Sequence, residues 1–147
     1  MRYVYDGDSR LKYLKEETDI ILAEDRCTDA GRIKEITTKG GVKTSYIYDE
    51  DGNISRLTIG DGTEEGLLYD AFMLYDLNGN RTGKTGSRLD VGGKQAEMAV
   101  SYRYDSMNRL TNEDRNGAGE RYAYDLYANR LLKEQYSGSS EGYRYNA

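Results

Sequence analysis

The sequence predicts an all-β protein built as an array of antiparallel β-hairpins that forms one curved sheet. Three observations support this fold class: a short tyrosine motif recurs along the 147 residues, turn residues follow each copy, and the chain contains no proline. Side chains alternate between the two faces of a strand, so two tyrosines separated by one residue point to the same face. The lack of proline is compatible with paired strands, in which every interior residue must offer its N–H group.

The repeated motif is Tyr-x-Tyr-Asp, with some copies degenerate. Its positions are Tyr3, Tyr5 and Asp6; Tyr46, Tyr48 and Asp49; Tyr75 and Asp76; Tyr102, Tyr104 and Asp105; Tyr122, Tyr124 and Asp125; and Tyr143 and Tyr145. A further copy at residues 25–28 has Cys27 in place of the second tyrosine. The period is about 21 residues, with two longer intervals. We therefore expect residues 1–147 to be one array of about six to seven hairpin repeats, incomplete at both ends.

Each aspartate begins a predicted hairpin turn. Gly52 follows Asp49 by three residues, and Gly79 follows Asp76 in the same way. A type I turn favours Asp at its first position and Gly at its fourth, where a positive φ is often needed. The chain then resumes with Arg-Leu or a close variant, which we interpret as the start of the return strand.

Two insertions and one ambiguous segment interrupt this pattern. Residues 60–66 and 83–93 are rich in glycine and charged residues, so we expect both to form surface loops. Residues 16–25 fit a helix or a strand equally well.

A single hairpin is marginal in water, so the repeats must stack on one another. Since Leu, Ile, Val and Phe make up only about 17% of the chain, we expect the fifteen tyrosines to form the core.

The composition excludes several kinds of site. The chain has no histidine, the commonest general base, and its single cysteine rules out an internal disulfide. A net charge of −5 argues against binding to nucleic acid. No apolar run is long enough to span a membrane. Carboxylate pairs such as Glu64 and Glu65 fit solvated loops better than acid/base chemistry. We predict no enzyme, no catalytic or metal site, no cofactor and no membrane insertion.

The pattern Tyr-x-Tyr-Asp-x-x-Gly-Asn/Arg-Arg-Leu, at a period near 21, resembles the bacterial RHS/YD-repeat family. The resemblance covers essentially the whole chain. It implies a spiral β-sheet that forms part of a shell around a polymorphic toxin domain, in a secreted or cell-surface protein; related repeats occur in insecticidal toxin complexes. The implied partners are the rest of a longer repeat protein and an enclosed downstream domain. The chain lacks the Asp-Pro self-cleavage signature of that family.

Two functions remain open from the sequence. The first is a non-catalytic structural segment that encloses cargo, as the resemblance implies. The second is a repeat module that binds carbohydrate or a cell surface through exposed tyrosines, since aromatic rings stack on sugars. The exposure of the tyrosine face distinguishes the two.

Overall fold

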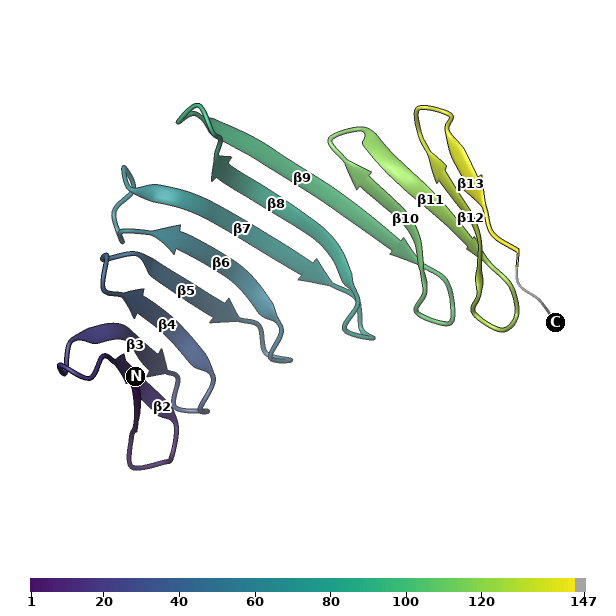
Figure 1. Cartoon of the computed structure of the whole chain (residues 1–147). Coiled ribbons are helices and arrows are strands. Elements are labelled where there is room, and N and C mark those ends of the chain that lie inside the picture. The colour runs from purple at the N-terminus through teal and green to yellow at the C-terminus, as the bar shows by residue number, and fades with distance from the viewer. Residues whose placement is uncertain (145–147) are drawn as a thin grey trace. The chain divides into compact units, whose positions relative to one another are not determined.

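The computed structural model describes residues 1–144, which form thirteen β-strands and no helix (Figure 1). The strands follow one another across a single sheet in chain order. Their bounds are β1 Arg2–Tyr5, β2 Leu11–Lys15, β3 Ile21–Cys27, β4 Ile33–Thr38, β5 Lys43–Tyr48, β6 Ile54–Gly60, β7 Leu67–Tyr75, β8 Arg81–Leu89, β9 Gln95–Tyr104, β10 Leu110–Arg115, β11 Ala118–Tyr124, β12 Arg130–Gln135 and β13 Ser140–Gly142. The predicted all-β array of antiparallel hairpins is confirmed.

The chain divides into two units. The first comprises Met1–Phe72 and Ser87–Ala96, and the second comprises Met73–Gly86 and Glu97–Ala147. Within each unit, the strands that follow one another in the sequence pair as antiparallel hairpins, for example β5 with β6 in the first and β11 with β12 in the second. The part of the chain that the structure describes contains no helix that could cross a membrane.

The tyrosine motifs end the odd-numbered strands. Tyr5, Tyr48, Tyr75, Tyr104 and Tyr124 are each the last residue of their strand, and an aspartate follows each of them. The pairing register shifts just before this last tyrosine, as between Ile47 and Tyr48. Such a shift is expected where a type I turn is followed by a residue with positive φ, because that residue forms a bulge.

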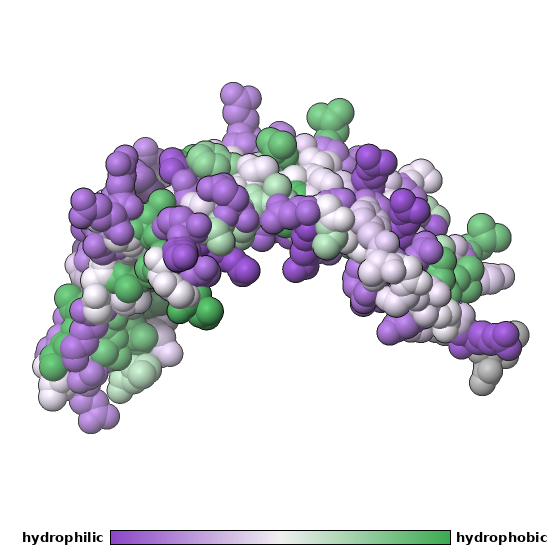
Figure 2. Space-filling model, turned by 90° about the horizontal axis from the view of Figure 1, so that it is seen from above, coloured by the Kyte–Doolittle hydropathy of each residue, from purple (hydrophilic) through white to green (hydrophobic). Residues whose placement is uncertain are grey.

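Burial in this sheet is shallow. Among the described residues the only buried hydrophobic ones are Ala71 and Met73, both in β7, with 0% and 9% of their surface exposed, and Gly60 at the end of β6 is buried as well. The tyrosines of the motifs are half-buried or exposed. The expectation that they form a closed core is therefore wrong: in a one-layered sheet, side chains are covered by neighbours on their own face, and no described segment packs over them. Figure 2 accordingly shows hydrophobic and hydrophilic side chains mixed over the visible surface.

The two insertions behave differently. Residues 61–66 form an exposed loop between β6 and β7, as predicted. Residues 83–93 do not form a long loop, because β8 runs through them to Leu89 and residues 90–93 form a tight turn before β9. In that turn the N–H of Gly93 donates to the carbonyl of Asp90. Backbone pairing to a neighbouring strand needs no apolar side chain, so a glycine-rich composition does not exclude a strand, and the loop prediction was wrong for this segment. The ambiguous residues 16–25 form a turn and the start of β3.

Candidate functional site

The repeated aspartates organise the turns that follow the tyrosine-ended strands of each unit. In the turn after β5, Oδ1 of Asp49 accepts the backbone N–H of Asn53 at 2.8 Å, and Oδ2 accepts the side-chain amide of Asn53 at 3.2 Å. In the turn after β9, the carboxylate of Asp105 binds the backbone N–H of Arg109 at 3.0 Å and its Nε at 2.7 Å. Asp6, Asp76 and Asp125 make the same set of bonds. The predicted turn-forming role of these aspartates follows from this geometry.

The fourth turn position takes a positive φ in these turns. The predicted positions Gly52 and Gly79 have φ values of 88° and 79°. Ser9, Asn108 and Ala128 occupy the corresponding positions in three other turns, with φ values of 63°, 59° and 66°. Hydrogen bonds to the aspartate hold the turn well enough for residues with a Cβ atom to adopt a conformation that favours glycine.

The hydrogen bonds keep these aspartates charged. The backbone N–H of Arg109, followed by its side chain, lowers the pKa of Asp105 against an opposing effect of burial. The side-chain amides of Asn80 and Asn129 have the largest effect in lowering the pKa values of Asp76 and Asp125. The carboxylates therefore act as fixed acceptors and have no proton to transfer near neutral pH.

The second tyrosine of a motif binds the backbone of the preceding repeat. The hydroxyl of Tyr48 donates to the carbonyl of Ile33 at 2.7 Å, that of Tyr104 to Arg81 at 3.0 Å, and that of Tyr124 to Leu110 at 2.8 Å. Each acceptor is the first residue of the return strand after the preceding turn. The sequence motif did not reveal these acceptors, although the use of tyrosine at that position in six copies of the motif was the available signal.

Arginines add a second link between repeats. The guanidinium carbon of Arg32 lies 5.4 Å from the ring centre of Tyr48, and that of Arg109 lies 4.9 Å from the ring centre of Tyr124. Arg109 also donates from Nη1 to the carbonyl of Asp125 at 2.7 Å. One arginine thus joins its own turn, the next turn and the next tyrosine, which makes it a structural residue.

The structure brings most of the predicted repeat residues into this arrangement, with exceptions at the ends. Tyr3 and Tyr5 are more than half exposed, and Tyr143 binds Glu141 through its hydroxyl at 2.9 Å. Tyr145 lies outside the described residues. Tyr46, Tyr102 and Tyr122 are half-buried on the same face as the second tyrosines. Cys27 is half-buried where another copy has a tyrosine.

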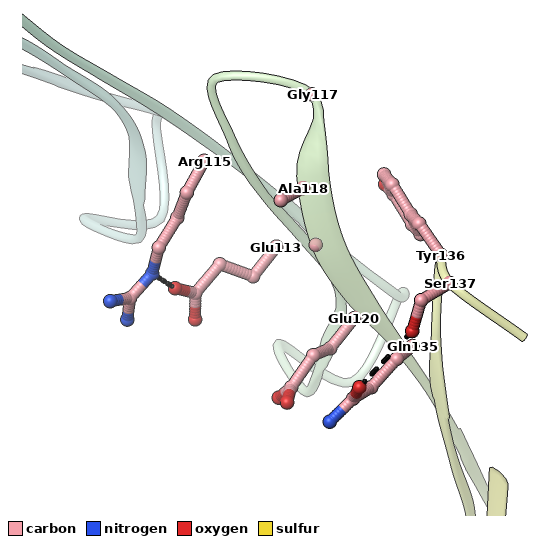
Figure 3. Close-up of a pocket in the computed structure, with 9 residues that line it drawn as sticks. Glu113, Arg115, Gly117, Ala118, Glu120, Gln135, Tyr136 and Ser137 are labelled. Carbon is pink, nitrogen blue, oxygen red and sulfur yellow. Dashed lines mark hydrogen bonds and ion pairs between the residues drawn. The ribbon is translucent and has the colours of Figure 1, made fainter. Parts of the chain in front are cut away.

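A pocket of 680 Å³ lies at the end of the β10–β11 hairpin, beside β12 (Figure 3). Figure 3 shows Glu113 bound to Nε of Arg115, and Gln135 accepting a hydrogen bond from Ser137. Glu120 binds Lys133 at 3.0 Å and accepts the hydroxyl of Tyr122. Burial, then the bond to Glu120, raises the pKa of Tyr122 to about 12. Glu113 and Glu120 are thus both held in ion pairs, an arrangement suited to binding polar groups.

Within residues 1–144, no group of three or more His, Cys, Asp or Glu side chains is placed to hold a metal ion. The same residues include no buried side-chain nitrogen or oxygen without a hydrogen-bond partner. The polar groups of the described chain thus bind one another or face solvent.

Comparison with known proteins identifies the repeat. Residues 28–64 match the family model described as the RHS repeat. The fold is similar to the crystal structure of TcdB2-TccC3-TEV, with a TM-score of 0.77 and 16% identity over 95% of this chain. It is also similar to a Photorhabdus luminescens Tc holotoxin pore with a TccC3 mutation, with a TM-score of 0.75 and 16% identity over 91% of this chain. The chain spans 8% of the length of either protein. A search of curated proteins finds no match.

Proposed function

From the match of residues 28–64 to the RHS repeat, we propose that this chain is a non-catalytic wall segment of a secreted or cell-surface toxin protein, whose curved sheet encloses a downstream polypeptide. The observation that carries the proposal is the bonding between repeats. Tyr48, Tyr104 and Tyr124 each attach their own repeat to the backbone of the one before. A sheet joined in this way can continue through many repeats without a second layer.

The side-chain chemistry supports a steric role. The aspartates of the turns are used as hydrogen-bond acceptors, and in the β10–β11 pocket Glu113 pairs with Arg115 and Glu120 pairs with Lys133. Acyl transfer and hydrolysis need a nucleophile, a base and a group that orients the base. The paired side chains of the pocket and of the turns do not form such a set.

The similar structures support the same assignment. One of them is a Tc holotoxin pore, both contain TccC3, and this chain matches a small part of each. The proposal extends their architecture to this chain: the repeats contribute one section of a wall, and other segments complete it.

Protease digestion of the longer protein tests the proposal. The parent, expressed with its downstream domain, is compared with a variant that lacks these repeats and with Tyr104→Ala/Tyr124→Ala, which removes two links between repeats. Tyr5→Ala is the matched control, because Tyr5 is 58% exposed. We expect the downstream domain to resist digestion in the parent and the control only. Equal digestion in all four proteins would contradict containment.

A second candidate function is carbohydrate binding, which the open pocket beside β12 favours. Arg115, Gln135 and Ser137 present polar groups there, and the small residues Gly117, Ala118 and Gly119 also line it. A glycan array probed with the chain and with Arg115→Ala/Gln135→Ala tests this function. Binding that the double variant loses would support the pocket, and no binding by the unaltered chain would exclude it.

A further inference from the structure

The turns of the second unit expose large apolar side chains at their tips. Leu77 is fully exposed in the turn after β7, Met107 is 57% exposed in the turn after β9, and Leu126 and Tyr127 are 91% and 87% exposed in the turn after β11. These three turns lie along one edge of the unit (Figure 1). We call these four residues the apolar edge.

The fold does not require apolar residues at these positions. The central positions of a type I turn accept most residues, and turns are usually polar. The equivalent positions of the first unit hold small or acidic residues, namely Gly7 and Asp8, Asp29 and Ala30, and Glu50 and Asp51. Since the same turn forms with either set, the apolar edge needs an explanation other than turn formation.

Hydrogen bonds hold the three turns beside one another. The side-chain amides of Asn78 and Asn80 donate to Oδ1 of Asn108 at 3.2 and 2.8 Å, which joins the first turn to the second. Nη1 of Arg109 donates to the carbonyl of Asp125, which joins the second turn to the third. A row of side chains carried on turns that are already fixed loses little entropy when it binds a partner.

We propose that the apolar edge binds the same edge of a second copy of this chain, with Met107 near a twofold axis. Successive turns on this edge are two strands apart, or roughly 10 Å at the usual strand spacing. In an antiparallel edge-to-edge arrangement, Leu77 of one copy meets Leu126 and Tyr127 of the other, and the two Met107 side chains meet each other. Each apolar tip thereby contacts an apolar tip, as a self-complementary interface requires.

The charges of the turns favour a protein partner over a lipid surface. Asp76, Asp105 and Asp125 begin these three turns, and their hydrogen bonds hold them in the charged form. Sinking the tips into a bilayer would remove three carboxylates from water at a high cost. Tip-to-tip contact leaves them at the rim of the interface, in solvent.

The size of the apolar edge predicts weak association. Four exposed side chains bury on the order of 500 Å² per copy. The total of about 1,000 Å² is at the lower limit for a specific interface. We therefore expect a reversible dimer.

Sedimentation equilibrium from roughly 10 μM to 1 mM tests the surface. The triple variant Leu77→Ser/Met107→Ser/Tyr127→Ser is expected to weaken self-association at least about tenfold. Val91→Ser is the matched control, because Val91 is a fully exposed apolar tip in the turn between β8 and β9. A triple variant that associates like the unaltered chain, or an unaltered chain that stays monomeric throughout, would overturn the proposal.

Symmetric cross-linking tests the twofold axis. In a Cys27→Ser background, Met107→Cys is expected to give a disulfide-linked dimer under a mild oxidant, whereas Val91→Cys is expected to stay largely monomeric. Equal cross-linking of both variants would contradict the arrangement. Vesicles of phosphatidylcholine provide the last comparison: co-sedimentation that depends on the apolar edge, without dimer formation, would replace the second copy with a lipid surface.

Discussion

The two units use the same face of the sheet differently. In the first unit a row of direct cross-strand partners on the tyrosine face is mostly apolar, and it comprises Ile36, Thr44, Ile59 and Tyr69. In the second unit a row of direct cross-strand partners on the tyrosine face is largely charged or polar. Its members are Tyr102, Glu113, Glu120 and Gln135. Direct partners share a face, so both rows extend the face that carries the motif tyrosines.

This difference shows that the repeat fixes the hairpin and leaves the strand interiors free to vary. Both units keep the aspartate turn and the bond from the second tyrosine to the preceding repeat. Between these points the first unit gains stability from buried apolar area, at about 25 cal/mol per Å². The second unit relies on ion pairs such as Lys133 with Glu120, which contribute roughly 0.2–1 kcal/mol each when exposed.

A charge placed on the tyrosine face should separate the two units most clearly. Leu57 lies between Tyr46 and the buried Ala71, so Leu57→Asp should lower the free energy of unfolding by about 2–4 kcal/mol. Gln135→Asp, on the polar row of the second unit, should change it by no more than about 0.5 kcal/mol. Urea denaturation of both variants measures the effect, and losses of equal size would remove the distinction between the units.

The positive-φ glycines should give the next largest effect. Replacing Gly52 or Gly79 with Val should cost on the order of 1–2 kcal/mol, because a β-branched residue is strained at this φ. Gly52→Val should cost more, since a Cβ atom there would lie 2.5 Å from the guanidinium carbon of Arg32, whereas nothing lies within 4 Å at Gly79. Denaturant melts should show little change for Lys84→Ala as a control; an equal loss in that variant would argue against the turn assignment.

The hydroxyl link between repeats should contribute equally in both units. Tyr48→Phe and Tyr124→Phe each remove one bond to a carbonyl of the preceding repeat, which should cost about 1 kcal/mol. Tyr5→Phe serves as the control because Tyr5 is mostly exposed. Thermal unfolding of the three variants measures the loss of stability. If the Tyr5 variant is destabilised as much as the others, the hydroxyl bond is not the source of that loss.

Acid should weaken the turns. Hydrogen bonds from Arg109 lower the pKa of Asp105 below its ordinary value of 3.8. The stabilisation from this carboxylate is therefore complete above pH 3.8 and is lost as the pH falls through the lowered pKa of the folded state. We expect Asp105→Asn to be destabilised at pH 7 and to match the unaltered chain more closely near pH 2. Urea melts measure the free energy of unfolding of both proteins across this range. A difference that does not change with pH would show that the charge of Asp105 does not stabilise the turn.

Asp25 should respond to acid in the opposite direction. It occupies a tyrosine position in the first unit, opposite Ile36, and burial raises its pKa. Its charge therefore opposes folding at neutral pH, and protonation relieves that effect as the pH falls through the raised value. Asp25→Asn should stabilise the chain at pH 7 by less than about 1 kcal/mol and lose this advantage in acid. Lower stability of the variant at pH 7 would contradict the burial of the charge.

The sequence by itself determined the hairpin repeat. The spacing of tyrosines fixed which residues share a face, and the positions of Asp49 and Gly52 predicted the turn and its positive φ. These features are local, since a type I turn is defined within four residues and strand alternation within two. The resemblance to RHS repeats rested on the same local pattern.

Only the tertiary structure decided the features that depend on lateral pairing. The hydroxyl acceptors of Tyr48, Tyr104 and Tyr124 lie 15, 23 and 14 residues earlier in the sequence, so no fixed spacing reveals them. Residues 83–89 became part of β8 because their backbone groups found partners in neighbouring strands, which composition does not report. Burial also depended on the fold. In a sheet with one layer, side chains are covered only by flanking strands, so the tyrosines stayed partly exposed, and the buried hydrophobic residues of the described chain are Ala71 and Met73.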